Sequence, residues 1–141
     1  MRPNSPKSFV GRDSELSTLN ELLERSTHGQ GQIAFVTGDA GIGKTHLVTE
    51  FGRQARRRQV EVVSGRAREL GGAPPYSLWI PLLTDLFGSD DPNLVQLNSA
   101  TTRIIPKNES DVTRFRLFES IASSIKKRSE HSPTLIVLEN L

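Results

Sequence analysis

The chain has 141 residues, of which 35% are hydrophobic and 24% are charged, as in one ordinary globular domain and unlike a disordered segment. It contains no cysteine, which excludes disulfides and zinc–thiolate sites. The formal net charge of +2 is too small to indicate a nucleic-acid-binding protein by itself. No helix-turn-helix or basic stripe is evident, so we expect no direct DNA contact from this segment. No apolar stretch approaches the ~20 residues of a membrane span, so we expect a cytoplasmic protein with no membrane contact.

The first third of the chain predicts an arm, a helix and a strand. Residues 1–8 are polar and contain prolines, so we expect a flexible arm. A helix is predicted from about Asp13 to Arg25, with Asp13 or Ser14 as its cap. Its apolar stripe comprises Leu16, Leu19, Leu22 and Leu23. Residues 32–37 are apolar and partly β-branched, which predicts a short strand.

Helices and strands alternate through the rest of the chain. The predicted elements are helices over 44–57, 76–87 and about 111–128, and strands over 60–64 and 134–138. Gly65 is expected to close the earlier of these strands, and Leu94 lies in a possible short helix within a turn-rich region. The apolar side of the last helix is predicted to comprise Val112, Phe115, Phe118, Ile121, Ala122 and Ile125. The final strand is a continuous apolar run, which is typical of a strand buried on both faces. This alternation predicts an α/β fold with a parallel sheet covered by helices.

One stretch fits the phosphate-binding pattern G-x-x-x-x-G-K-[ST] without a mismatch. It comprises Gly38, Asp39, Ala40, Gly41, Ile42, Gly43, Lys44 and Thr45. A random chain of this length would match about once in two hundred trials. The glycines allow turns in which successive N–H groups converge on phosphate oxygens, and the following helix directs its positive end at the same anion. Lys44 would contact the β- and γ-phosphates and Thr45 would bind Mg²⁺. His46 is close enough to approach a ligand, or else faces solvent on the helix.

A second candidate site lies at the end of the last apolar run. A phosphate loop needs an acidic partner that holds Mg²⁺, and Glu139 follows four apolar residues in the position expected for it. The alternative is an ordinary core strand with a solvated end. The next residue is Asn140, which can orient water but cannot accept its proton. We therefore expect slow or absent hydrolysis, unless the alignment moves by one residue.

Several stretches together resemble the AAA-like, signal-transduction (STAND-type) P-loop ATPase domains found in large LuxR-type transcriptional regulators of bacteria. They are residues 9–16, the loop from Thr37 to Thr45, Pro74-Pro75-Tyr76, and residues 135–141. The resemblance implies a three-layer α-β-α P-loop NTPase fold that binds ATP rather than GTP. It places Val10, Gly11 and Arg12 near the adenine, and Glu139 at the metal-binding strand tip.

The resemblance covers only the N-terminal part of such a domain, so we expect residues 9–141 to be a partial domain that ends after the Walker B strand. In this class a sensor strand lies between the phosphate-loop strand and the Glu139 strand. Our main hypothesis is an ATP-binding segment that binds Mg·ATP through residues 38–45, with weak or no hydrolysis by this chain alone and possible self-association in its full-length parent. The alternatives are a self-sufficient ATPase, in which Glu139 serves both metal and water, and a non-functional truncated remnant.

Overall fold

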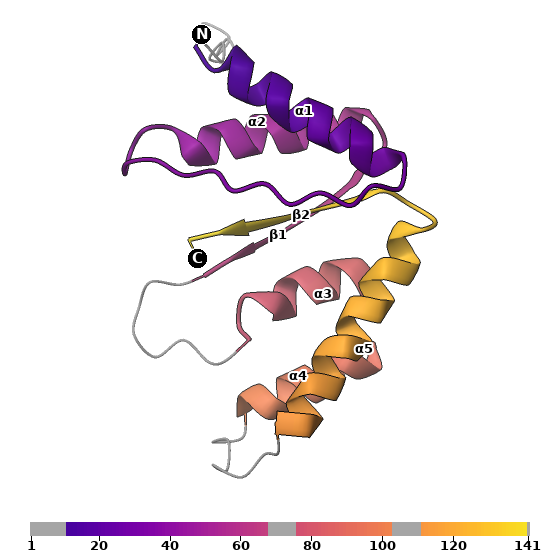
Figure 1. Ribbon diagram of the computed structural model, residues 1–141. Helices are drawn as coiled ribbons and strands as arrows, with labels where there is room; N and C mark the ends of the chain where they lie inside the picture. The colour runs from indigo at the N-terminus through magenta and orange to yellow at the C-terminus, as the bar shows by residue number, and fades with distance from the viewer. Residues whose placement is uncertain (1–10, 68–75, 103–110, 141) are drawn as a thin grey trace, which may run out of the picture. The chain divides into compact units, whose positions relative to one another are not determined.

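The computed structural model describes residues 11–67, 76–102 and 111–140. The elements follow one another as α1 (Asp13–Thr27), α2 (Lys44–Arg57), β1 (Glu61–Arg66), α3 (Trp79–Phe87), α4 (Pro92–Thr102), α5 (Asp111–Ser129) and β2 (Thr134–Glu139) (Figure 1). They fall into two compact units, Met1–Gln59 and Val60–Leu141, and each unit is described by itself. The predicted arm over 1–8, Val10 and the Pro74-Pro75 pair lie outside the described residues.

In the first unit, α1 forms where the leucine pattern predicts it. Its buried side chains are Leu16, Leu19 and Leu23. The predicted cap is wrong, because the helix begins directly after Arg12 and Asp13 is already helical, with no side-chain capping hydrogen bond. Asp13 and Glu15 instead place negative charge in the first turn, where it favours the positive end of the helix dipole.

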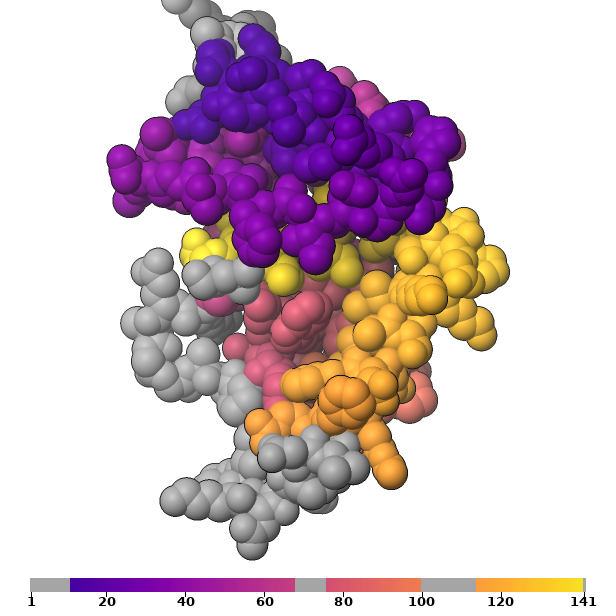
Figure 2. All heavy atoms as spheres, viewed as in Figure 1, coloured from indigo at the N-terminus to yellow at the C-terminus, as the bar shows by residue number. Residues whose placement is uncertain are grey.

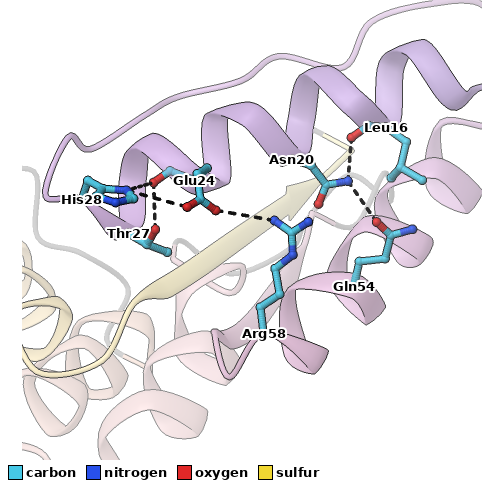
Figure 3. Close-up of polar contacts among 7 residues, drawn as sticks. All are labelled: Leu16, Asn20, Glu24, Thr27, His28, Gln54 and Arg58. Atoms are coloured by element: carbon cyan, nitrogen blue, oxygen red, sulfur yellow. Dashed lines mark hydrogen bonds and ion pairs between the residues drawn. The ribbon is translucent and has the colours of Figure 1, made fainter.

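Helix α2 packs beside α1 and contributes Leu47, Phe51 and Ala55 to the apolar contact. A polar contact accompanies it, because the amide nitrogen of Asn20 donates to the Leu16 carbonyl at 2.8 Å and to Gln54 Oε1 at 2.9 Å (Figure 3). Asn20 Oδ1 is buried and has no hydrogen-bond partner among the described residues. The hydrogen bond between the Asn20 and Gln54 side chains therefore favours one register of α1 against α2.

The same amide pair continues into an ionic group on α2. Gln54 Nε2 donates to Glu50 Oε1 at 3.0 Å, and Arg53 Nε donates to Glu50 Oε2 at 2.7 Å. These bonds, from Arg53 first and Gln54 second, lower the pKa of Glu50 to about 2. Glu50 therefore stays ionised, and the basic end of α2 is partly neutralised by the helix itself.

Residues 31–39 run extended between α1 and α2, but no strand forms there, so the strand predicted over 32–37 is wrong. Ile33 and Phe35 are 84% and 83% exposed, and only Val36 is half-buried. A strand is stabilised by backbone hydrogen bonds to a neighbouring strand, and none pairs with this segment in the part of the chain that the structure describes. Apolar, β-branched composition is therefore not sufficient for a strand at this position.

The second unit contains a parallel pair of strands, as the alternation of elements predicts. Strand β1 pairs with β2 in a register that runs from Glu61 opposite Thr134 to Arg66 opposite Glu139. The residues of β2 are half-buried rather than buried on both faces, because β1 is its one strand neighbour within the described ranges. The core of this unit comprises Val63, Leu82, Leu83, Leu86, Leu94, Leu97, Leu117 and Ile121.

Gly65 does not close β1, as its position predicted, but lies inside the strand. A Cβ at this position would be 2.6 Å from the Leu78 carbonyl oxygen and 2.9 Å from Leu78 Cδ1. The glycine is needed because Leu78, the N-cap residue of α3, lies against the strand at this point. Helix α3 then begins at Trp79, which places Pro81 within the first turn, where a missing N–H breaks no helical hydrogen bond.

The turn-rich region contains a longer helix than the sequence predicts. Asp91 caps α4, because its Oδ1 accepts hydrogen bonds from the backbone N–H groups of Asn93 at 2.9 Å and Leu94 at 3.2 Å. The Asp91 carboxylate is therefore a structural group of the helix start.

Helix α5 forms over its predicted range, but its buried side agrees with the predicted one only in part, since Ile121 and Ile125 face the core. Leu117 and Ile121 are in the core, whereas Phe115 and Phe118 are 61% and 45% exposed. Figure 2 shows α5, coloured orange to yellow, at the surface of the viewed face. The Phe118 ring contacts Tyr76 edge-on, with ring centroids 5.8 Å apart. Helix α5 therefore has two overlapping apolar stripes, and the stripe that contains Leu117 is the one that packs in the core.

Candidate functional site

The glycine-rich loop leads directly into the first turn of α2. Gly43 is the N-cap of this helix with a φ of 97°, and Gly41 has a φ of 78°. Any other residue would be strained at these angles, and no atom lies within 4 Å of a Cβ built at either glycine. Because Gly43 has no side chain to cap the helix, the positive end of α2 is open to an external anion.

The Lys44 side chain forms hydrogen bonds with the first two residues of the loop. Its Nζ donates to the Gly38 carbonyl at 2.7 Å and to the Asp39 carbonyl at 2.9 Å. The ammonium is thereby held against the start of the loop, and the Ile42 N–H closes a turn onto the Asp39 carbonyl at 3.4 Å. The positive charge of Lys44 and the N-terminus of α2 thus lie within the same eight residues, 38–45.

Arg12 connects the start of α1 to the same loop. Its Nη2 donates to the Ile42 carbonyl at 2.6 Å, and its Nη1 lies 3.5 Å from Glu15 Oε1. The Ser14 hydroxyl, more than Arg12, lowers the pKa of Glu15. The guanidinium therefore joins a carboxylate to a loop carbonyl. Sequence reasoning placed Arg12 near the adenine by resemblance alone, and no local pattern indicates a contact across 30 residues.

The remaining residues of the predicted loop site are exposed. They are Asp39, Ala40, Thr45 and His46. Thr45 and His46 lie in the first turn of α2, and the Thr45 carbonyl accepts a hydrogen bond from the Thr49 hydroxyl at 2.7 Å. Of the predicted site residues, those from Gly38 to His46 form one continuous segment of the first unit, and Arg12 contacts this segment at Ile42.

Glu139 ends β2 in the second unit, where it has a partner that the sequence did not reveal. Arg66, the last residue of β1, lies opposite it, with Arg66 Nη2 2.7 Å from Glu139 Oε2. The Glu139 carbonyl also accepts a hydrogen bond from the Ala67 N–H at 2.9 Å. Arg66 could have been found from the sequence only by fixing the parallel register of two strands 73 residues apart.

Asn140 follows with a φ of 59°, in the left-handed region that asparagine enters more readily than most residues. An asparagine at position 140 is therefore also favoured by the backbone conformation at the end of β2. Within the described ranges, no group of three or more histidine or carboxylate side chains is placed to hold a metal. None of the helices that the structure describes is long and apolar enough to cross a membrane.

Comparison with known proteins identifies the family of the chain. A family model described as AAA ATPase domain matches residues 8–141. The chain belongs to the AAA ATPase domain family. A search of solved structures gives no significant match. Members of this family have a P-loop α/β fold and a nucleotide-binding loop. The predicted resemblance to an AAA-like P-loop ATPase domain is therefore confirmed.

The AAA ATPase domain is also similar to an uncharacterised protein of Rhizobium meliloti (strain 1021). The two are 22% identical over an alignment of 162 positions, which covers 94% of this chain and 16% of the relative. The chain therefore spans about one sixth of the length of that relative.

The AAA ATPase family typically binds Mg²⁺ with its nucleotide, and the first unit has a loop suited to this ligand. Its open glycine turns leave room beside an uncapped helix N-terminus, which is the arrangement that phosphates favour. In the first unit, the Thr45 hydroxyl is an oxygen donor of the kind that Mg²⁺ prefers.

Proposed function

We propose that this chain binds Mg·ATP through residues 38–45 and hydrolyses it slowly or not at all on its own. The observation that carries the proposal is the loop itself, in which Gly41 and Gly43 adopt left-handed turns and Lys44 is held against the loop carbonyls. In this role Lys44 exchanges carbonyl partners for the β- and γ-phosphates, and backbone N–H groups of the loop donate to phosphate oxygens.

Arg12 is part of the proposed site as a group that positions the loop. Its hydrogen bond to the Ile42 carbonyl fixes one peptide of the loop, and Glu15 holds the guanidinium from the other side. Gly11 and Val10 would lie on the adenine side, as in the family that the sequence resembles. Thr45 and Glu139 are the proposed Mg²⁺ ligands.

The low turnover in this proposal rests on Asn140. A carboxylate at this position would take a proton from the attacking water, whereas the amide can only orient the water. The proposed larger role is a nucleotide switch in a longer signal-transduction protein of the LuxR-regulator type, with a three-layer α-β-α domain and self-association of the parent. DNA contact is assigned to other parts of that parent.

The test is a titration of Mg·ATP against the purified chain by calorimetry. Lys44→Ala should weaken binding by about 10- to 100-fold, because a charge-assisted hydrogen bond contributes roughly 1.5–3 kcal/mol. Lys126→Ala is the matched control, since Lys126 is an exposed lysine in the last turn of α5. Equal affinity for the wild type and Lys44→Ala, or no binding at all, would refute the proposal.

Turnover is measured separately as phosphate release. We expect wild type and Lys44→Ala to release phosphate at the same low rate. A wild-type rate clearly above the Lys44→Ala background would favour the alternative, a self-sufficient ATPase in which Glu139 serves both the metal and the water.

A further inference from the structure

Three carbonyl groups of the glycine-rich loop accept hydrogen bonds from cationic side chains. Lys44 Nζ donates to the carbonyls of Gly38 and Asp39, at 2.7 and 2.9 Å. Arg12 Nη2 donates to the Ile42 carbonyl at 2.6 Å. Lys44 belongs to the phosphate-binding pattern, whereas Arg12 is the N-cap residue of α1 and lies outside the loop in the sequence. The two cations therefore fix peptide groups at the beginning and near the end of the loop.

The orientation of each carbonyl also sets the orientation of the next N–H group. In a planar trans peptide, the C=O bond of one residue and the N–H bond of the next point in opposite directions. The N–H groups that follow the three held carbonyls are those of Asp39, Ala40 and Gly43. Within residues 11–67, none of these three N–H groups donates a hydrogen bond. They therefore point away from the two cations and are available to donate to an anion.

The Arg12 guanidinium is held on its other side by Glu15. Arg12 Nη1 lies 3.5 Å from Glu15 Oε1, and the Ser14 hydroxyl donates to Glu15 Oε2 at 2.7 Å. The Arg12 side chain is 23% exposed, whereas that of Glu15 is 47% exposed. Because a guanidinium presents its donors in a fixed plane, one arginine can hold two acceptors in a set geometry. All of these contacts lie within the first unit.

We propose that Glu15 and Arg12 act together to orient the Gly43 N–H toward the nucleotide phosphates. Glu15 is a positioning residue in this role, because it acts through the Arg12 guanidinium. The inference rests on the proposed function, because it needs phosphates bound by residues 38–45. Neither side chain contacts the base or the sugar in this role. The contribution of Glu15 and Arg12 is therefore the same for any ligand that carries a triphosphate.

The expected effects are modest, because one hydrogen bond and one partly exposed ion pair are involved. Arg12→Ala should weaken the binding of Mg·ATP by about three- to tenfold, which corresponds to the loss of one hydrogen bond. Glu15→Gln should weaken it by about two- to fivefold, because exposed ion pairs contribute less. In an Arg12→Ala background, Glu15→Gln should have no further effect, since the group through which Glu15 acts is gone.

The experiment measures affinity by calorimetry for Mg·ATP and for inorganic tripolyphosphate with Mg²⁺, which has neither base nor sugar. Arg12→Ala and Glu15→Gln should each weaken the binding of both ligands by the same factor. Arg25→Ala and Glu21→Gln, which change exposed residues of α1, are the charge-matched controls and should leave both affinities unchanged. A loss for Mg·ATP alone would indicate a contact with the base or sugar and overturn the inference. Full effects of both substitutions in the double variant would also overturn it.

A measurement on the wild-type chain covers the case in which a variant fails to fold. The amide resonance of Gly43 is followed by NMR while tripolyphosphate with Mg²⁺ is added. It should shift with the midpoint of the calorimetric titration, because the N–H gains a phosphate acceptor, and a resonance that stays fixed would overturn the inference. If neither ligand binds, or if both bind equally to Lys44→Ala, the proposed function itself fails. Lys44-dependent binding that is unchanged in Arg12→Ala and Glu15→Gln rejects only the role of these two residues.

Discussion

Replacing Gly65 with alanine tests the packing of the second unit most directly. The added Cβ would lie 2.6 Å from the Leu78 carbonyl oxygen, and real Cβ atoms essentially never approach a heavy atom within 3.0 Å. The backbone before α3 must therefore move by at least about 0.4 Å away from β1. Overpacking of this kind costs roughly 1–3 kcal/mol.

An opposing effect reduces that cost. Alanine has fewer unfolded conformations than glycine, which stabilises a compatible site by about 0.4–1 kcal/mol. The net prediction for Gly65→Ala is a loss of roughly 1–2 kcal/mol in the free energy of unfolding, or about 4–16 °C in Tm for a unit of this size. The assay is urea unfolding followed by the fluorescence of the single tryptophan, Trp79, which lies in α3 of the same unit.

Two further variants show whether the backbone contact causes the loss. Ser64→Ala is the control on the neighbouring, exposed position of β1 and should change stability by less than about 0.5 kcal/mol. Leu78→Ala removes the side-chain contact at 2.9 Å but leaves the carbonyl, so it should rescue Gly65→Ala only in part. A Gly65→Ala chain as stable as the wild type would refute the reasoning.

Three other predictions concern polar groups. Asp91→Ala should lower the free energy of unfolding by about 1 kcal/mol in urea, because α4 loses its cap, and unchanged stability would contradict that role. The hydrogen bond from Arg128 lowers the pKa of Glu61 below the unfolded value of 4.5, so its stabilisation is present above pH 4.5 and is lost as the pH falls through the folded value. Glu61→Gln should therefore flatten the acid side of a stability–pH curve, and a curve equal to that of the wild type would argue against the pair. Asn20→Ala and Gln54→Ala should each cost about 1 kcal/mol, and the double variant should cost less than the sum in unfolding followed by circular dichroism. Strict additivity would show that the two amides act separately.

Local pattern was sufficient for the positions of α1, α2 and α5 and for the glycine-rich loop. Lys44–Arg57 is the predicted helix with the predicted bounds, because a glycine precedes it and its apolar residues recur at helical spacing. The family match over residues 8–141 agrees with the phosphate-loop pattern. Both features depend on residues close together in sequence, which is the information that a single sequence carries most directly.

Features that depend on distant neighbours could not be predicted. The segment 32–37 has strand composition, yet a strand exists only with a partner to pair with. On α5, the pattern contains two apolar stripes that share Ile121, and only the position of the packed helices selects the one with Leu117. The contacts of Arg12 with Ile42 and of Arg66 with Glu139 cross 30 and 73 residues, so no local rule indicates them.

The long separation between β1 and β2 has a consequence for how the second unit folds. Its sheet cannot form until residue 134 is available, whereas each helix between the strands can form from local contacts. Closing so long a loop is entropically unfavourable, and non-local pairing of this kind slows folding. We therefore expect α3, α4 and α5 to form before β1 finds its partner during synthesis, so that the pairing of β2 with β1 limits the rate of folding.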